Sequence, residues 1–589
     1  MDKSKEEPAV VIALDIGSSH SGYAYQFRGD FTDKTGVIHV SRNWNTYNET
    51  FKTSSCLLLE RKTQMRIVIG ENAEMRYSRI CDEGKQFDFL FFKKFKMILY
   101  REDFRINDNT KNQAEDYTGE HVPFTLVMSK FIGGLLEHCY KKLEIYDEQK
   151  AKAKAEGTEQ AQKIDDTNIR WVITVPAIWN DVAKGAMRKS AIDAGIRSDQ
   201  LILALEPEAA ALYRMSLSSQ ERFRMNKLGN VGSKFMVVDM GGGTIDITAV
   251  EVLEKDQLKQ IMAAHGGPWG AQRINDAFSQ LVTEVFKTKD GSPFASCTRA
   301  DLFKMEIEFE RQKVGLRGNL EPDEEYIKLP LPEKVWKELK EVIIKDEDNK
   351  YAHYFEKTED GLYFKPNIIS EKLFGESLQV IMTYLQSIIR TENAQIVLVG
   401  GFAESGIVKD KFAEVFPSRS INVPGNPFYA VLKGADLYGQ DPDILKSRIS
   451  RFTYVPDVCV PFNPAEDPSE KKMVNSTGRI LCKDVFSIHV RSNQVVFLNE
   501  EQPAQAYNPL EKDQKQMRCD IYQTESVEPK YVTDAGCEKI VVILIEMPDV
   551  TGGTNRKVEV TMIYGGTELR VKCVDETTGK EFKTSINYH

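Results

Sequence analysis

The sequence lacks the features that would place it in a membrane or on a polyanion. No stretch approaches the roughly 20 apolar residues that span a bilayer, and the first ten residues, MDKSKEEPAV, hold no apolar run typical of a secretory signal. Lys and Arg number 78 against 88 Asp and Glu, so the net charge of -10 gives no global attraction to nucleic acid or to an anionic membrane. We expect a protein of the cytoplasm or nucleus, with no membrane span and no nucleic-acid partner.

Paired cysteine motifs are also absent. The nine cysteines are scattered from Cys56 to Cys573, an odd number, and no two of them form a C-x-x-C motif. This favours reduced, mostly buried thiols over the alternatives of a metal site or a disulfide framework. The 589 residues, 41% hydrophobic and 28% charged, are too many for one core, so at least two domains of a globular protein are expected.

What the sequence does contain is glycine at the ends of apolar strands. Residues 9–27 (AVVIALDIGSSHSGYAYQF) predict a strand, a Gly/Ser turn and a second strand, and residues 235–252 repeat this pattern around three glycines. A third strand, in AQIVLVGGFAES at 394–405, turns through two glycines into a helical pattern beginning near Gly406. Helices follow each hairpin, which predicts an α/β fold of two lobes, about 9–230 and 231–440.

The stretches between these turns differ in character. Trp171 begins a strand in WVITVPAIWND, and helical spacing follows it, with Asn180 or Asp181 as the N-cap. Residues 147–166 are charged and Ala-rich without apolar periodicity, as expected of an exposed helical extension or a mobile insertion.

The predicted secondary structure changes after about residue 450. KIVVILIEM, RKVEVTMIY and TELRVKCV are short alternating or β-branched strands with no convincing helix among them. We expect a linker at 441–452 and an all-β C-terminal domain at 453–589, without a helical lid.

The glycine turns suggest a specific chemistry. A strand that ends in an aspartate and turns through glycines brings backbone N–H groups close to a phosphate, while the carboxylate faces a magnesium ion. One such turn is also found in ordinary hairpins. Two turns, following Asp15 and Asp239, can hold the phosphates of a nucleotide from opposite sides.

Five motifs together resemble a known family. They are LDIGSS, WVITVPAIWND, ALEPEAAAL, VVDMGGGTIDIT and IVLVGGFAES, and they occur in the order of the corresponding motifs of the actin-like ATPase superfamily, which has a ribonuclease H-like fold. The residues of several of them resemble those of the 70-kDa heat-shock chaperones. The β-rich end and FFKKFKM at 91–97 resemble the divergent heat-shock 70 kDa protein 12A/12B branch. The resemblance covers nearly the whole chain.

This resemblance implies a site for ATP or ADP with Mg²⁺. The carboxylates of Asp15, Glu206 and Asp239 would contact the metal, mostly through water. Lys94, chosen over Lys93, would reach the γ-phosphate, and Asp246 would orient the attacking water. The full set implied comprises the catalytic residues Lys94, Glu206, Thr244 and Asp246, and the nucleotide-binding residues Asp15, Gly17, Ser18, Ser19, Asp239, Gly241, Gly242, Gly243, Thr244, Glu310, Lys313, Gly400, Gly401 and Phe402.

The adenosine side departs from the family pattern. Glu310 and Lys313 are retained. Val314 replaces the usual arginine and Arg317 the usual serine of the same helix. In the third turn and after it, Phe402 replaces a serine, Glu404 an arginine and Phe428 an aspartate. Loss of a planar cation removes a stacking contact worth about 0.5–2 kcal/mol, which Phe402 can replace by aromatic stacking. The choice of ATP over other nucleotides therefore stays open.

The leading interpretation is a cytosolic ATP/ADP-binding, chaperone-like protein with slow, magnesium-dependent hydrolysis, whose β domain binds protein clients or signalling partners. A regulatory scaffold that binds nucleotide with little or no hydrolysis is the first alternative. A small-molecule kinase of the same superfamily is the second, although the TVPA and EPEAAA motifs argue against it.

Overall fold

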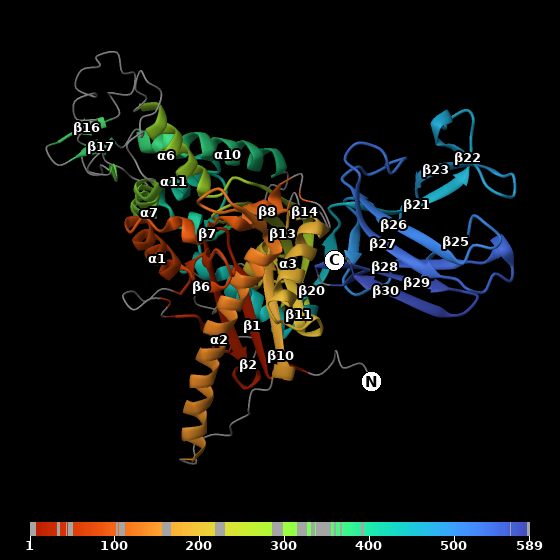
Figure 1. Ribbon diagram of the computed structural model, residues 1–589, viewed down its shortest axis with the longest axis horizontal. Coiled ribbons are helices and arrows are strands. Elements are labelled where there is room, and N and C mark those ends of the chain that lie inside the picture. The colour runs from red at the N-terminus through yellow and green to blue at the C-terminus, as the bar shows by residue number, and fades with distance from the viewer. Residues whose placement is uncertain are drawn as a thin grey trace.

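The computed structural model covers most of the chain with mixed helices and strands (Figure 1). Val314 is the last described residue of its helix, and Arg317 lies outside the described part. Residues 102–103 and 105–111 also lie outside it, as do most of residues 320–365. The structure describes residues 7–31, 36–42, 44, 51–101, 104, 112–155, 166–217, 230–285, 299–314, 327–331, 336, 355–358, 361–365, 368–389, 394–565 and 567–585.

The first large sheet is built on the N-terminal hairpin. β1 (Val10–Ile16) pairs antiparallel with β2 (His20–Phe27), as predicted, and every residue of β1 is buried. β1 also pairs parallel with β10 (Ile169–Val175), which pairs parallel with β11 (Leu201–Leu205). The sheet is completed at its other edge by β3 (His39–Val40) and β4 (Thr53–Ser54).

The second large sheet repeats this plan around the three glycines. β12 (Lys234–Met240) and β13 (Ile245–Val252) form the predicted second hairpin, and β18 (Gln395–Val399) runs parallel to β12. The order is β19-β18-β12-β13-β14-β20-β24. The remaining strands are β14 (Leu258–Gly267), β19 (Ile421–Asn422), β20 (Leu445–Ile449) and β24 (Val495–Phe497).

Two alanine-rich helices lie at the junction of the two sheets. α4 (Glu206–Ser216) and α12 (Ala430–Gln440) share one apolar cluster with β1, β10, β12 and β13. A Cβ atom at Gly434 would lie 1.6 Å from the carbonyl oxygen of Ala209, so the backbones approach as closely as glycine allows. This contact brings the ends of β1 and β12 to the same region of the molecule.

Other helices cover the outer faces of the sheets. Asn180 caps α3 (Asp181–Asp193), accepting the N–H of Ala183 at 2.9 Å. α2 (Phe124–Ala155) takes in the first part of the expected 147–166 extension, and residues 156–165 lie outside the described part. Within the described ranges, no helix has the length and apolar character needed to cross a bilayer. The other helices are α1 (Glu71–Asp82), α6 (Gln272–Val285), α7 (Arg299–Val314), α10 (Glu376–Ile388) and α11 (Gly406–Val415).

Small sheets accompany these layers. β7 (Phe89–Lys93) pairs with β5 (Cys56–Glu60) and leads into a short 3-10 helix at Phe95–Tyr100. The remaining short strands are β6 (Arg66–Ile69), β8 (Gln113–Glu115), β9 (His121–Pro123), β15 (Ile327–Lys328), β16 (Phe355–Lys357) and β17 (Leu362–Phe364).

The described residues after Leu445 form strands and 3-10 turns, drawn blue in Figure 1. They make two facing sheets, β22-β23-β21-β26-β27 and β25-β28-β29-β30. The bounds are β21 (Thr453–Pro461), β22 (Lys472–Val474), β23 (Ile480–Phe486), β25 (Gln505–Tyr507), β26 (Gln516–Thr524), β27 (Glu538–Glu546), β28 (Val558–Gly565), β29 (Glu568–Asp575) and β30 (Lys580–Ser585).

The expected linker at 441–452 is partly a strand. β20 pairs parallel with β14 and antiparallel with β24, so it extends the second large sheet. Arg448 on β20 forms a buried bidentate ion pair with Glu208 of α4, at 2.7 and 2.6 Å. The chain therefore leaves the α/β part through a paired strand.

Candidate functional site

The two predicted phosphate turns face each other in the structure. The turn after β1 presents Ser18 and Ser19, and the turn after β12 presents Gly242 and Gly243. A Cβ atom at Gly242 would lie 2.2 Å from Oγ of Ser19, and one at Gly243 would lie 2.4 Å from Oγ of Ser18. Only glycine allows this approach, so the contact explains the glycines of the second turn.

The third glycine turn closes on the second. Gly400 has a φ of +86°, and a Cβ atom there would lie 2.4 Å from the carbonyl oxygen of Met240 and 2.6 Å from Oδ1 of Asp239. Phe428 packs on the neighbouring Gly401, whose Cβ position is 3.1 Å from its ring. Three turns that were separate in the sequence thus meet at one place.

A cavity of about 330 Å³ lies where the three turns meet. Its volume is within the usual range for small-molecule sites. Of the residues predicted for the site, it is lined by Asp15, Gly17, Ser18, Ser19, Glu206, Asp239, Gly241, Gly242, Gly243, Thr244, Glu310, Lys313, Gly400, Gly401 and Phe402.

Two predicted catalytic residues do not line this cavity. Asp246 is buried in the wall, where its Oδ1 accepts the backbone N–H of Ile178 at 3.2 Å. Lys94 pairs instead with Glu306 of α7.

The lysine from FFKKFKM that lines the cavity is Lys96. It is 5% exposed, and its Nζ lies 2.8 Å from Oε1 of Glu206. Lys94 has a left-handed backbone with φ of 60°, which redirects the chain between β7 and the following turn. Lys96, rather than Lys94, is therefore the lysine of this motif that lines the cavity, which corrects the choice made from the sequence.

A second lysine balances the first carboxylate of the site. Nζ of Lys52 lies 2.6 Å from Oδ2 of Asp15, and Oγ1 of Thr174 donates to Oδ1 at 2.9 Å. Burial alone would raise the pKa of Asp15, but the charges of Lys52 and Lys96 and the hydrogen bonds from Lys52 and Thr174 together outweigh burial and lower it. Asp15 is therefore held as a carboxylate.

The other acidic groups crowd one another. Burial and the neighbouring charges of Asp246 and Asp15 raise the pKa of Glu206 to about 7, despite the opposing effect of Lys96. Burial raises the pKa of Asp246 to about 6, and burial with the surrounding carboxylates raises that of Asp239 well above its ordinary range. Such a concentration of buried negative charge favours the binding of cations.

The side of the cavity predicted to hold the nucleoside is rich in aromatic rings. Phe402 is buried, with its ring centroid 6.3 Å from that of Phe374. Phe428 packs edge-on against His20 with centroids 5.9 Å apart. All four of these residues line the cavity. The rings leave apolar surface on which a base can stack.

Glu310 and Lys313 border the same side. Nζ of Lys313 donates to Oε2 of Glu310 at 2.7 Å and to Oδ1 of Asn275 at 2.8 Å. The pair belongs to the cavity lining, as predicted, and holds its charges in a fixed arrangement.

The residues present fit a magnesium nucleotide. Glycine turns offer backbone donors, lysines offer positive charge, and carboxylates are the oxygen ligands that Mg²⁺ and its water shell prefer. Among the described side chains, no three His, Cys, Asp or Glu groups converge for direct coordination of a metal. Asp15, Glu206 and Asp239 are the groups that would contact the hydrated ion.

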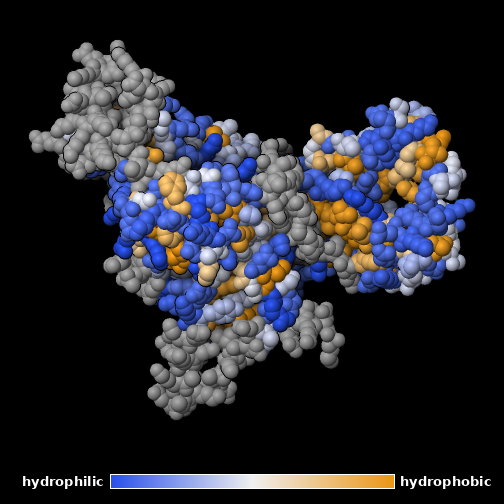
Figure 2. All heavy atoms as spheres, viewed as in Figure 1, coloured by the Kyte–Doolittle hydropathy of each residue, from blue (hydrophilic) through white to orange (hydrophobic). Residues whose placement is uncertain are grey.

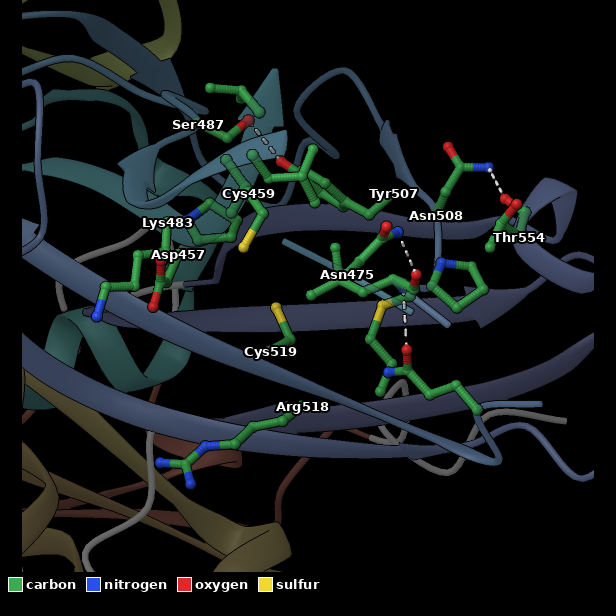
Figure 3. Close-up of a pocket in the computed structure, with 18 of the residues that line it drawn as sticks. Asp457, Cys459, Asn475, Lys483, Ser487, Tyr507, Asn508, Arg518, Cys519 and Thr554 are labelled. Carbon is green, nitrogen blue, oxygen red and sulfur yellow. Dashed lines mark hydrogen bonds between the residues drawn. The ribbon is translucent and has the colours of Figure 1, made fainter. Parts of the chain in front are cut away.

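A second cavity lies between the two sheets of the C-terminal part. It has a volume of about 950 Å³, and Figure 3 shows Cys459 of β21 and Cys519 of β26 directed into it. Tyr507 borders it and donates a hydrogen bond to Oγ of Ser487 at 2.8 Å. Apolar side chains line much of its wall, among them Val458, Val460, Leu481, Leu510, Met517 and Val560.

Comparison with known proteins finds similarity to heat-shock 70 kDa proteins. A family model described as "Hsp70 protein" matches residues 148–331. The chain is 28% identical over 652 residues to heat shock 70 kDa protein 12B of Homo sapiens, covering 98% of this chain and 91% of the relative. It is 29% identical over 649 residues to heat shock 70 kDa protein 12A of Mus musculus, with the same coverage. Chaperone protein DnaK of Thermoplasma volcanium is 27% identical over 152 residues, covering 26% of this chain and 23% of that relative.

The mixed α/β fold and the match to the Hsp70 model support a nucleotide-binding, ATPase-like protein. Within that class, the chain is similar over nearly its whole length to heat shock 70 kDa proteins 12A and 12B, which confirms the resemblance of the sequence motifs.

Several residues of the cavity were not foreseen from the sequence. Lys52, Lys96 and His20 line it, although the sequence motifs had not singled out these three residues. Lys96 was within reach of sequence reasoning, because it is the third lysine of FFKKFKM. Lys52 follows a stretch without periodicity and offered no such signal.

Proposed function

We propose that the protein is a cytoplasmic, chaperone-like nucleotide-binding protein that holds ATP or ADP with magnesium in the cavity between the glycine turns and hydrolyses ATP slowly. The contact of Gly242 and Gly243 with Ser19 and Ser18 is the observation that supports this most, because two facing turns surround a polyphosphate as one turn cannot.

The residues of the cavity have complementary roles in this proposal. Backbone N–H groups of the turns and the ammonium of Lys96 stabilise negative charge on the γ-phosphate and on the leaving oxygen. Thr244 and Asp246 orient the attacking water. Magnesium, when bound, neutralises phosphate charge, and the carboxylates of Asp15, Glu206 and Asp239 hold its water shell.

Slow turnover follows from the way the charges are paired. Lys96 is bound to Glu206 and Lys52 to Asp15, so both pairs must rearrange when phosphate enters. Preorganised sites accelerate reactions because they avoid this reorganisation.

Hydrolysis is tested by phosphate release from ATP at steady state. We expect Asp239→Asn and Lys96→Ala each to reduce release to background, because one removes a metal-side carboxylate and the other the γ-phosphate cation. Lys471→Gln, which removes a buried lysine paired with Asp484 in the C-terminal part, is the matched control and should release phosphate at the wild-type rate. Wild-type release no faster than that of the two site variants would contradict the ATPase proposal.

A nucleotide-binding regulatory scaffold is the second candidate. The position of Asp246 favours it, since this carboxylate already accepts the N–H of Ile178 and does not line the cavity. Nucleotide binding without phosphate release above the Asp239→Asn background would support this candidate.

We also propose that the C-terminal strands, 453–589, bind protein clients or signalling partners, while residues 1–440 bind nucleotide. The volume of the second cavity and its mixed lining support this assignment, because apolar side chains offer contact area to a partner and polar groups among them fix its orientation.

A further inference from the structure

Lys52 is a buried cation of the nucleotide cavity to which the proposed mechanism assigns no contact with phosphate. It is 8% exposed and lies directly before β4. Its ammonium is 2.6 Å from Oδ2 of Asp15 and 4.4 Å from the centroid of the Phe428 ring. A buried lysine is unusual on a cavity wall and requires an anionic partner.

The position of this ammonium is set by three surrounding elements. Its stem packs on β2, where a Cβ atom at Gly22 would lie 2.9 Å from Cγ of Lys52. Asp15, near the end of β1, lies on one side, and Phe428, which packs on Gly401 of the third turn, lies on the other. Nζ of Lys52 thus lies between the first and third turns, while Lys96 pairs with Glu206 elsewhere on the wall.

The two lysines match two of the carboxylates that would otherwise repel phosphate. Asp15 and Glu206 both line the cavity, and each has an ammonium within 3 Å, at 2.6 and 2.8 Å. A site that depends on a metal ion to bridge its carboxylates and the phosphates has no affinity for phosphate in its absence. Here the chain itself supplies two positive charges at the place where the metal would act.

We propose that Lys52 is a phosphate-binding residue, and that Lys52 and Lys96 together allow the protein to bind a nucleoside polyphosphate without a divalent cation. This inference rests on the proposed nucleotide binding. When phosphate enters, the ammonium of Lys52 moves from Asp15 to a phosphate oxygen, and Asp15 becomes free for the water shell of magnesium if the metal is present.

The test compares the dissociation constants of ADP and adenosine in EDTA by thermal-shift titration. In wild type, ADP should bind at least about tenfold more tightly than adenosine without metal. In Lys52→Gln this advantage of ADP should fall by about tenfold, while adenosine binds as before. Lys471→Gln, again the control for loss of a buried paired lysine, should keep the wild-type ratio.

Failure of metal-free binding through Lys52 and failure of nucleotide binding as such give different results in this experiment. If wild type binds ADP only when magnesium is added, or if Lys52→Gln keeps the wild-type ratio of ADP to adenosine affinity, the inference is overturned. An equal loss of affinity for both ligands, with a lower melting temperature of the unliganded variant, assigns Lys52 a structural role and also overturns it. If wild type binds no nucleotide with or without magnesium, the proposed function itself fails.

Discussion

At the scale of single residues, Gly242 and Gly243 show what three consecutive glycines after Asp239 accomplish. Their backbones lie against the serines of the opposite turn, with no room for a side chain. We expect Gly242→Ala to destabilise the protein by about 1–3 kcal/mol, as overpacking of a tight contact does, and to weaken ADP binding. The midpoint of urea denaturation, with and without ADP, measures both effects.

Gly133→Ala is the matched control for this substitution. Gly133 lies within α2, and a Cβ atom there would meet no atom within 4 Å. Alanine is preferred over glycine in a helix by about 1 kcal/mol, so this variant should be as stable as wild type or more stable. If Gly242→Ala behaves like Gly133→Ala, the two turns do not meet as the structure has them.

Residues also show where sequence reasoning reaches its limit. The glycine turns and their carboxylates were predicted because glycine and aspartate occur there in a pattern that ordinary strands do not need. The sequence favours Lys94 over Lys93 for the γ-phosphate, yet the left-handed backbone of Lys94 turns Lys96 to the cavity. No sequence pattern indicates that a lysine has a positive φ.

At the scale of elements, β20 connects the sheet that borders the first cavity to the C-terminal strands. Arg448 on this strand holds Glu208, two residues beyond Glu206 at the start of α4. We expect Arg448→Met to destabilise the protein by about 3–5 kcal/mol, because Glu208 is left as a buried charge without its partner. The measurement is the shift of the urea denaturation midpoint.

The double variant Arg448→Met with Glu208→Gln provides the control. It removes both charges, and the loss should be clearly smaller than that of Arg448→Met alone. Equal losses in the single and double variants would show that the ion pair itself is not what fixes β20.

The sequence predicts a linker where the structure has β20, and the reason is that β20 pairs with a strand far away in the sequence. Residues 441–452 hold two aspartates, a proline and three basic residues, a composition typical of a connection between domains. Its partner β14 lies far earlier in the chain, and parallel pairing over such a separation follows no local pattern. The two hairpins were predicted correctly because their strands are adjacent in the sequence.

At the scale of the whole molecule, the C-terminal strands pack on the α/β part through specific contacts. The hydroxyl of Tyr454 donates to Oδ2 of Asp181 at 2.7 Å, and Arg188 pairs with Glu568. Figure 1 shows β22, β23 and β25 on the side of the C-terminal part away from this junction. The second cavity, which β23 and β25 border, is therefore accessible to a partner while the junction is intact.

A charge introduced into this cavity tests the proposed partner binding. Val460 lines the cavity, and Val460→Glu should weaken the binding of a fluorescent apolar peptide by about tenfold, because a carboxylate in an apolar wall loses solvation. Val474→Glu is the control, since Val474 of β22 is 60% exposed and is not part of the lining. Equal affinity of the two variants would argue against this cavity as the binding site.

The outer face of the C-terminal part carries exposed apolar side chains. Figure 2 shows an apolar patch on the C-terminal part, over β26 and β27, where Val542 and Leu544 are exposed. The β-branched run in KIVVILIEM predicts a strand, but it places apolar residues on both faces, so the sequence does not indicate which face packs inward. In the structure Ile540, Ile543 and Ile545 are buried, whereas Val542 and Leu544 are exposed.

The most direct test of the central claim is the melting temperature of the full chain with ADP and magnesium. A ligand that binds only the native state must stabilise it, by about 2.7 kcal/mol at a concentration 100 times the dissociation constant. The account predicts a rise in melting temperature that grows with ADP concentration and is lost in Asp239→Asn. No rise with any of ADP, ATP, GDP or GTP would contradict it.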